Sequence, residues 1–206
     1  MISSNQEMIE YLESNGVLKS LRLKSALEYA DRKKFVVSHY KDSAYFDFPI
    51  EITGGQTISQ PSTVAFMLEL LDVKNGNNVL DIGAGSGWVS VILSKLVGQN
   101  GKVYAFEINK RIGKIGQQNI NQFARNNIYY EVIDAKQKWQ NYLPYDRIHS
   151  AAAFARIPED LLNTLVINGI IIAPTQDGFI RKITRLNKNN FHEERFYGFS
   201  FVPFHN

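Results

Sequence analysis

The sequence predicts an α/β protein with a doubly wound, Rossmann-like parallel sheet. Segments with the apolar pattern of buried strands alternate with segments of helical periodicity through the middle of the chain. One of these strands runs directly into glycines at alternate positions, Gly83, Gly85 and Gly87, and a helical pattern follows them. The next strand ends on an acid, Glu107, about twenty residues after the glycines. Together these features indicate a fold that lets a nucleoside-containing cofactor approach the backbone.

The length and composition indicate one globular unit. With 206 residues the chain can build one hydrophobic core with small additions at its ends, so we expect a single domain over 1–206. Its 44% hydrophobic and 21% charged residues are typical of ordinary globular proteins. The absence of cysteine excludes a disulfide, a thiolate metal site and a thiol nucleophile. A basic leader and an apolar run of about eighteen residues are both missing, which favours a cytoplasmic protein that does not contact a membrane.

The charged residues argue against a nucleic-acid partner. The formal net charge is +3, from 23 basic and 20 acidic residues, and the basic residues are scattered along the chain. Nucleic-acid surfaces usually need Lys and Arg gathered on one face. The four histidines, His39, His149, His192 and His205, lack the spacing of a metal site, so we expect no metal.

The N-terminal part, 1–60, is expected to form a helical cover and an active-site loop. Residues 3–34 repeat apolar side chains at helical spacing, with an interruption at Gly16. Residues 35–50 are rich in aromatic and β-branched side chains. They predict a short, irregular cover that ends at the turn Gly54-Gly55.

The Rossmann-like core is expected over 61–175. It opens with a helix that has Pro61 at its first position and that Asn75-Gly76 would end. We then expect strands at 78–81, 102–107, 128–133, 147–152 and 170–173, and helices at 88–97, 110–123 and 158–165. A turn at Asn168-Gly169 would separate the last helix from the last strand. Residues 176–206 are expected to add antiparallel strands, at 179–184 and 191–204, to one edge of the sheet.

The spacing of the glycines narrows the class of cofactor. A dinucleotide site has its third glycine three residues after the second, so that the helix N-terminus faces a pyrophosphate. Here the spacing is two, which suits S-adenosylmethionine, a nucleoside cofactor without phosphate. The glycines would admit its methionine part, Asp81 would hold its ammonium group and Glu107 would accept its ribose hydroxyls. Asp134, after the next strand, would accept the adenine amino group, unless it only caps the turn that follows.

Several motifs are similar to those of one family. They include segments outside the generic methyltransferase fold, namely Asp31-Arg-Lys-Lys-Phe-Val36, Ala44-Tyr-Phe-Asp47 and Gly54-Gly-Gln-Thr-Ile-Ser-Gln-Pro61. Further segments follow in the family's order at 145–148, 151–153, 157–158, 161–162, 173–174 and 201–204. From about Ala30 to the C-terminus, the chain therefore resembles the protein-L-isoaspartate O-methyltransferase family.

The resemblance implies an activity and a set of site residues. The methyl group of S-adenosylmethionine would pass to the free carboxylate of an L-isoaspartyl residue in a damaged protein or peptide, which would leave S-adenosylhomocysteine. Ser59 occupies the position of the family's catalytic serine and would orient that carboxylate. The cofactor would also contact Gln56, Thr57, Ile58, Ser59, Ile108 and Ala135. Alternatively, Thr57 and Ser59 would only cap or brace the helix that begins at Pro61.

Three residues depart from the family pattern. Ile133 and Ala135 stand where glycines usually flank the acid at Asp134, and Thr175 stands where the family commonly has glycine. The substrate is therefore less firmly indicated than the cofactor. Alternatives are methylation of an aspartate in a peptide natural product, methylation of nucleic acid, or binding of S-adenosylmethionine without catalysis. The main interpretation is a monomer whose partners are isoaspartyl peptides and proteins.

Overall fold

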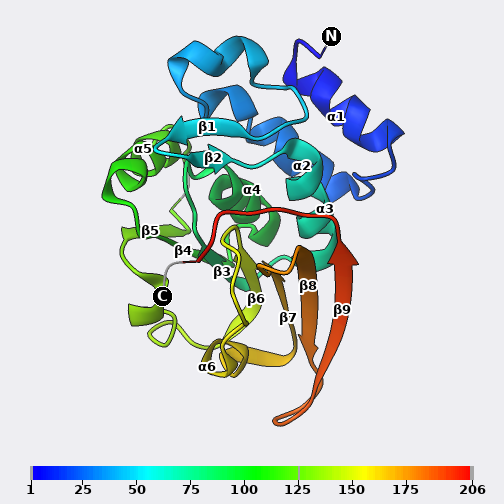
Figure 1. The fold of residues 1–206 in the computed structure, drawn as a ribbon, viewed down its shortest axis with the longest axis vertical. Helices are drawn as coiled ribbons and strands as arrows, with labels where there is room; N and C mark the ends of the chain where they lie inside the picture. The colour runs from blue at the N-terminus through cyan, green and yellow to red at the C-terminus, as the bar shows by residue number, and fades with distance from the viewer. Residues whose placement is uncertain (1, 125, 205–206) are drawn as a thin grey trace.

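A seven-stranded sheet in the order β5-β4-β3-β6-β7-β8-β9 forms the centre of the computed structural model, which describes residues 2–124 and 126–204 (Figure 1). Its parallel strands are β3 (Asn78–Ile82), β4 (Lys102–Glu107), β5 (Ile128–Val132), β6 (Tyr145–Ser150) and β7 (Leu165–Pro174). Antiparallel pairing adds β8 (Phe179–Arg185) and β9 (Phe191–Tyr197). The predicted doubly wound sheet with an antiparallel C-terminal edge is confirmed.

Both faces of the central strands are covered, as their apolar sequences predict. Val79 and Val103 pack into a core with α3 (Pro61–Leu71), α4 (Trp88–Val97) and α5 (Lys110–Ile120). Leu80 and Phe106 lie on the same two strands, but their side chains point to the other face. They pack into a second core with α6 (Glu159–Leu162). Alternate side chains of a strand point to opposite faces, so continuous apolar runs are needed where helices or loops cover both.

The predicted helix boundaries hold best where local signals are strong. The bounds of α4 are those predicted, and α3 starts with Pro61 at its first position. However, α3 ends at Leu71, before the expected stop at Asn75-Gly76. The chain leaves the helix because Asp72 adopts a left-handed conformation, with φ 50°, and Val73 is then buried. Similarly, α5 ends at Ile120 rather than at Phe123.

The predicted turn at Asn168-Gly169 is wrong. Both residues lie inside β7, whose pairing with β6 joins Tyr145 to Leu165 but Arg147 to Ile170. The extra residues form a bulge in which Asn168 has φ 64°. An Asn-Gly pair is typical of turns because both residues tolerate a left-handed backbone. A bulge can require the same left-handed conformation.

The predicted strand at 191–204 is also only partly correct. β9 ends at Tyr197, and Gly198 turns the chain away from the sheet with φ 105°. Residues 198–204 then cross over the carboxyl ends of the parallel strands, as the last coloured segment of Figure 1 shows. Ala153 fixes this crossing segment, because its N–H donates to Val202 O and its carbonyl accepts from Phe204 N, both at 2.8 Å.

The N-terminal cover lies over the same end of the sheet (Figure 1). It consists of α1 (Asn5–Ser14), α2 (Leu21–Tyr29), 3₁₀ turns at Arg32–Lys34 and Ser38–Ser43, and a hairpin of β1 (Ile50–Thr53) and β2 (Gln56–Ile58). The predicted helices and the turn at Gly54-Gly55 are confirmed. The cover is more regular than expected, because that turn closes a hairpin: its glycines have φ 59° and 76°, as tight two-residue turns require. Within 2–124 and 126–204, no helix combines the length and apolarity needed to cross a membrane.

Candidate active site

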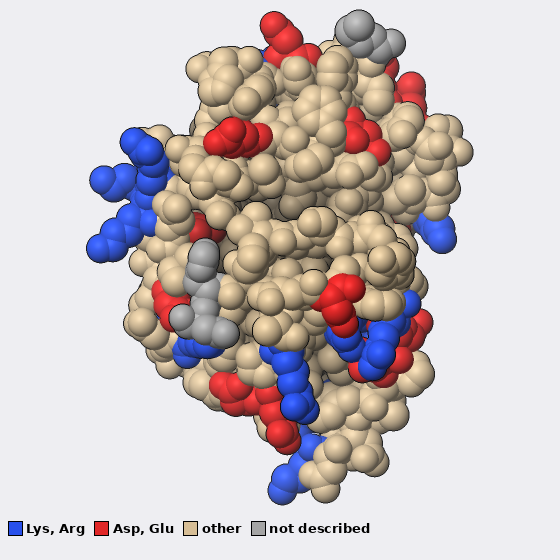
Figure 2. Space-filling view, in the orientation of Figure 1, with Lys and Arg blue, Asp and Glu red and all other residues tan. Residues whose placement is uncertain are grey.

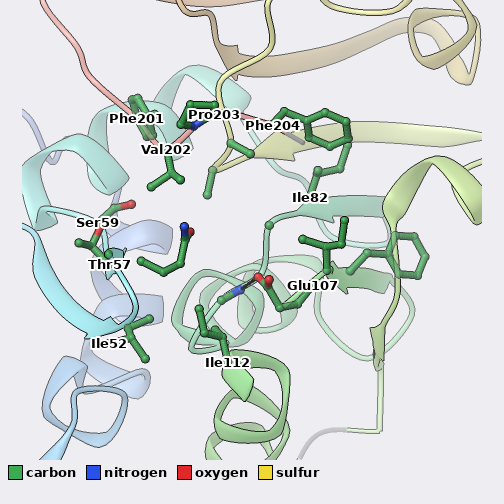
Figure 3. Close-up of a pocket in the computed structure, with 18 of the residues that line it drawn as sticks. Ile52, Thr57, Ser59, Ile82, Glu107, Ile112, Phe201, Val202, Pro203 and Phe204 are labelled. Carbon is green, nitrogen blue, oxygen red and sulfur yellow. Dashed lines mark hydrogen bonds between the residues drawn. The ribbon is translucent and has the colours of Figure 1, made fainter. Parts of the chain in front are cut away.

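The site lies where the winding of the sheet reverses. From β3 the chain moves outward through β4 and β5, and it then returns to β6 on the other side of β3. In open α/β sheets, ligands bind outside the carboxyl ends of the strands at such a point. A cavity of about 500 Å³ opens here between the sheet, the β1–β2 hairpin and the crossing segment 198–204 (Figure 3). It is large enough for a small organic molecule.

Two of the three alternating glycines face this cavity. Gly83 and Gly85 line it and have left-handed φ values of 74° and 54°. A Cβ on Gly85 would meet nothing closer than Gly83 O, at 3.8 Å, so the backbone there is open to a ligand. Strand β4 fixes the start of this loop, because the Phe106 carbonyl accepts from the N–H groups of Gly83 and Ala84 at 2.9 and 3.1 Å.

The third alternating glycine, Gly87, is placed differently from the first two. It does not belong to the cavity lining, and a Cβ there would lie 2.7 Å from Ile120 Cγ1 and 3.2 Å from Gly116 O. The third glycine therefore lets α5 pack closely on the loop. Gly116 acts from the other side: its missing Cβ leaves room for Tyr130, whose hydroxyl donates to Gly85 O at 2.8 Å.

Replacing Gly87 by alanine should destabilise the protein more than replacing Gly76. Both glycines have nearly the same φ, 84° and 85°, but Gly76 has nothing within 4 Å of its Cβ position. Gly76→Ala thus measures the cost of left-handed backbone alone, about 1 kcal/mol. Gly87→Ala adds the overlap with Ile120, which should cost about 1–3 kcal/mol more. Urea unfolding of both variants tests this, and equal losses would show that Ile120 moves aside freely.

Glu107 is one of two acidic residues in the cavity wall, the other being Asp134. Glu107 is the last residue of β4. Its Oε2 accepts from Gly85 N at 2.9 Å, and its Oε1 accepts from Asn109 N at 2.8 Å. Burial raises the pKa of Glu107, and the two backbone N–H groups oppose this shift. An ionised carboxylate has about four acceptor sites, so each oxygen keeps one for a ligand. The geometry suits a pair of neighbouring hydroxyl groups.

Asp81 does not reach the cavity. It is fully buried beneath the glycine loop, where Oδ2 accepts from Ser90 Oγ at 2.6 Å and Oδ1 lies 2.8 Å from His149 Nδ1. These contacts join β3, α4 and β6. The structure thus gives Asp81 a bracing position under the loop, and its contact with the ammonium group of the cofactor stays a prediction. His149 is explained by the same network, His39 and His192 are exposed, and His205 lies outside the described residues.

Asp134 caps the turn that follows it and also lies at the cavity. Its Oδ1 accepts from Lys136 N at 3.0 Å and caps the 3₁₀ turn Ala135–Gln137, yet the residue also lines the cavity. Ile133 and Ala135 line the cavity beside it, so their side chains narrow this end compared with glycine. Ile108 and Ile112 complete an apolar slot next to Glu107. Ile112 was not predicted, because its contribution depends on how α5 packs against the sheet.

Strand β2 and the loop between it and α3 form the opposite wall. Gln56, Thr57 and Ser59 line the cavity, and Figure 3 shows the Ser59 side chain across the cavity from Glu107. Ile58 points into the core and is 4% exposed, so its predicted cofactor contact is not supported by its place in the structure.

Asp47 supplies the cap of α3. The N-cap residue Gln60 makes no side-chain capping bond, and the N–H of Ser62 instead donates to Asp47 Oδ1 at 2.8 Å. Asp47 Oδ2 accepts from Gln60 Nε2 at 3.1 Å. Since a third residue performs the capping, the interpretation of Thr57 and Ser59 as mere caps of α3 loses its support.

The crossing segment contributes residues that the sequence did not mark as part of the site. Residues 200–204 line the cavity, and Phe204 stacks on Phe154 with ring centroids 4.5 Å apart. Pro49 and Ile52 add apolar surface from the hairpin side. The motif at 201–204 was noticed only as part of the family resemblance, because contacts over such a long stretch of chain have no local signal.

This arrangement defines a class of protein. The order of the parallel strands, the open glycine loop without a phosphate-binding helix end and the acid at the end of β4 are those of Rossmann-like S-adenosylmethionine-dependent methyltransferases. Comparison with known proteins identifies the family within this class. The model of the family described as protein-L-isoaspartate(D-aspartate) O-methyltransferase matches residues 3–206. The chain belongs to this family, which confirms the resemblance seen in the sequence.

Individual relatives agree along nearly the whole chain. A protein-L-isoaspartate O-methyltransferase of Thermosipho melanesiensis is 37% identical over 198 residues, which cover 95% of this chain and 99% of the relative. A protein of the same name from Fervidobacterium nodosum is 36% identical over 198 residues, which cover 95% of this chain and 98% of the relative. A Plasmodium falciparum structure assigned to the same activity, in complex with S-adenosyl-L-homocysteine, superimposes with a TM-score of 0.87 at 25% identity and covers 98% of this chain and 99% of its own.

Proposed function

We propose that the protein transfers a methyl group from S-adenosylmethionine to the free carboxylate of L-isoaspartyl residues in damaged proteins and peptides. The carrying observation is that Ser59 and Glu107 face one cavity from opposite walls, in a chain of this family. Glu107 and Gly85 suit the nucleoside on one side, and Ser59 suits a carboxylate on the other. S-adenosylhomocysteine, which is bound in the Plasmodium falciparum relative, is the expected product.

The reaction asks little of the protein beyond alignment. A carboxylate is ionised at neutral pH, so it attacks the methyl group of a sulfonium without a strong general base. The methyl–sulfur bond breaks as the new carbon–oxygen bond forms, and S-adenosylmethionine supplies the electrophilic methyl group. Ser59 would donate a hydrogen bond to the carboxylate oxygen that does not attack. Orientation falls to such donors rather than to the dipole of α3, because Asp47 already occupies that helix N-terminus.

The ester formed in this way would begin repair. Attack on the ester carbonyl by the backbone nitrogen of the following residue releases methanol and closes a succinimide, and water then opens the ring. These later steps need no further group from the protein, so the proposed catalytic task ends with methyl transfer.

The alternatives have less support. Figure 2 shows Lys and Arg in separate groups, interspersed with Asp and Glu, on the face that it presents. After β6 the chain reads Ser150-Ala-Ala-Ala-Phe154, without the Asn/Asp-Pro-Pro-Tyr type of motif that grips an amino group to be methylated. A protein that only binds S-adenosylmethionine would not need the Ser59 hydroxyl in the cavity wall. Isoaspartyl peptides and proteins are therefore the partners in this proposal, with the protein acting as a cytoplasmic monomer.

A peptide assay tests the proposed function. The purified protein should transfer label from methyl-labelled S-adenosylmethionine to an isoaspartyl peptide and not to the same peptide with ordinary aspartate. This selectivity is expected because the isoaspartyl residue presents its α-carboxylate at a different place relative to the main chain. Binding of S-adenosylmethionine without transfer to either peptide would contradict the proposal. Equal transfer to both would point to a different substrate.

A further inference from the structure

Arg32 is a buried cation that the proposed chemistry does not use. It begins the 3₁₀ turn Arg32–Lys34 and is fully buried. Burial lowers the pKa of Arg32 to about 9, and the nearby Asp47 carboxylate opposes this shift, so the guanidinium remains charged at neutral pH. Taking a charge out of water is costly unless its hydrogen bonds are well satisfied. The contacts of this side chain are therefore informative.

The acceptors of Arg32 are all backbone carbonyls. They belong to Ala44 (2.7 Å) and Phe46 (3.3 Å) for Nη1, and to Phe48 (3.1 Å), Ile58 (3.5 Å) and Ser59 (2.9 Å) for Nη2. One guanidinium thus ties the chain before the hairpin to the segment that carries Ser59. The carbonyl of Ser59 itself is among its closest partners.

The guanidinium also contacts the helix that follows the glycine loop. Its Cζ lies 5.2 Å from the ring centroid of Trp88, which is within the range of a cation–π interaction. Trp88 is the first residue of α4 and directly follows Gly87. Its indole N–H donates to Ala30 O at 2.8 Å, two residues before Arg32. Arg32 therefore contacts the main chain at Ser59 on one side and, on the other, the ring of the residue that begins the helix after the glycine loop.

We infer that Arg32 is a positioning residue that fixes the main chain at Ser59 relative to the glycine loop. This inference rests on the proposed function. With its carbonyl held by Arg32, and with Asp47 holding Gln60 and Ser62 just beyond it, Ser59 keeps its place while its side chain remains free to meet the substrate. Transfer requires the attacking oxygen, the methyl carbon and the sulfur to lie in line. A misplacement of about 1 Å can lower the rate about 100-fold.

The shape of arginine matters as much as its charge. The guanidinium is a planar fork with donors that point in different directions, whereas lysine presents a single compact ammonium. Lysine at position 32 would keep the charge but could not serve the Nη1 and Nη2 acceptors at once. Arg32→Lys is therefore the informative substitution.

A double-mutant cycle tests the inference. Arg32→Lys should lower kcat about 10- to 100-fold, while S-adenosylmethionine affinity changes by less than about threefold. In the Ser59→Ala background the same substitution should lower kcat by less than about twofold, because the hydroxyl that it misplaces is gone. Arg22→Lys is the matched control: Arg22 also bonds a backbone carbonyl, Leu96 O at 2.6 Å, but away from Ser59, and its replacement should leave kcat unchanged. Equal reductions by Arg32→Lys in both backgrounds would overturn the inference.

Asp47→Ala provides a second variant if Arg32→Lys does not fold, as judged by loss of S-adenosylmethionine binding. It removes the bonds from Asp47 to Gln60 Nε2 and Ser62 N, which hold the chain just after Ser59. It should therefore also lower kcat by misplacing Ser59. An unchanged kcat would mean that the placement of this segment does not limit transfer, which overturns the inference. Failure of the unmodified protein to methylate an isoaspartyl peptide would instead remove the proposed function, whatever the Arg32 variants do.

Discussion

Replacing Ser59 with alanine is expected to lower the turnover of isoaspartyl peptide by about 100-fold or more, the scale seen when one well-placed hydrogen-bond donor is removed from a reacting site. The hydroxyl faces the cavity from the wall opposite Glu107. It should act on the substrate carboxylate rather than on the cofactor, so S-adenosylmethionine affinity should change little. Steady-state kinetics with the peptide and calorimetric titration with S-adenosylmethionine separate the two effects.

Ser62→Ala is the matched control for this experiment. Ser62 lies in the first turn of α3, the helix that follows Ser59. Its backbone N–H, which alanine retains, is the group that donates to Asp47. Its replacement should leave both turnover and affinity close to those of the unmodified protein. If Ser59→Ala lowered turnover and affinity by the same factor, a role in bracing the loop would be the better explanation.

Replacing Glu107 with glutamine should weaken S-adenosylmethionine binding by about 10- to 100-fold, because hydrogen bonds to a charged acceptor contribute roughly 1.5–3 kcal/mol each. The substitution also turns an NH₂ group toward either Gly85 N–H or Asn109 N–H, both of which now donate to the carboxylate. Burial raises the pKa of Glu107, so this carboxylate is protonated at a higher pH than an exposed glutamate. The affinity of the unmodified protein for S-adenosylmethionine should therefore begin to fall at that higher pH on acidification. Calorimetric titration over a range of pH measures both effects.

Glu131→Gln is the control for the Glu107 variant. Glu131 lies on the neighbouring strand β5 and pairs with Phe106 in the sheet, but its carboxylate bonds Tyr142 and Lys138 outside the cavity lining. S-adenosylmethionine affinity should be the same with either residue at position 131. If Glu107→Gln also left affinity unchanged, Glu107 would be a support of the glycine loop and not a ligand of the cofactor.

The prediction from sequence was most successful where local signals and buried strands coincide. The bounds of α4 and β4 follow from the glycine loop before one and the apolar run of the other. The place of Glu107 at the cavity could be predicted because the geometry of consecutive parallel strands puts their carboxyl ends along one edge. Pro61 likewise located the start of α3, and with it the loop that carries Ser59.

An error arose where one local pattern serves two structures. Asn168-Gly169 has the preference for left-handed backbone of a turn, but the chain uses it in a bulge of β7. The sequence also could not show the surroundings of Asp81, because Ser90 and His149, which contact it, come from other elements.

The sequence by itself determined the fold class and the family, and it supplied candidate residues for holding a nucleoside, because strand periodicity, glycine spacing and motif order are properties of neighbouring residues. Only the tertiary structure decided which of these residues share a cavity. It turned Gly87 and Asp81 away from the cavity and brought residues 200–204 to its wall. It also placed Arg32 in contact with both the Trp88 ring and the Ser59 carbonyl. The physical reason is that burial and hydrogen bonding between distant segments depend on the packing of the whole chain, which no local pattern encodes.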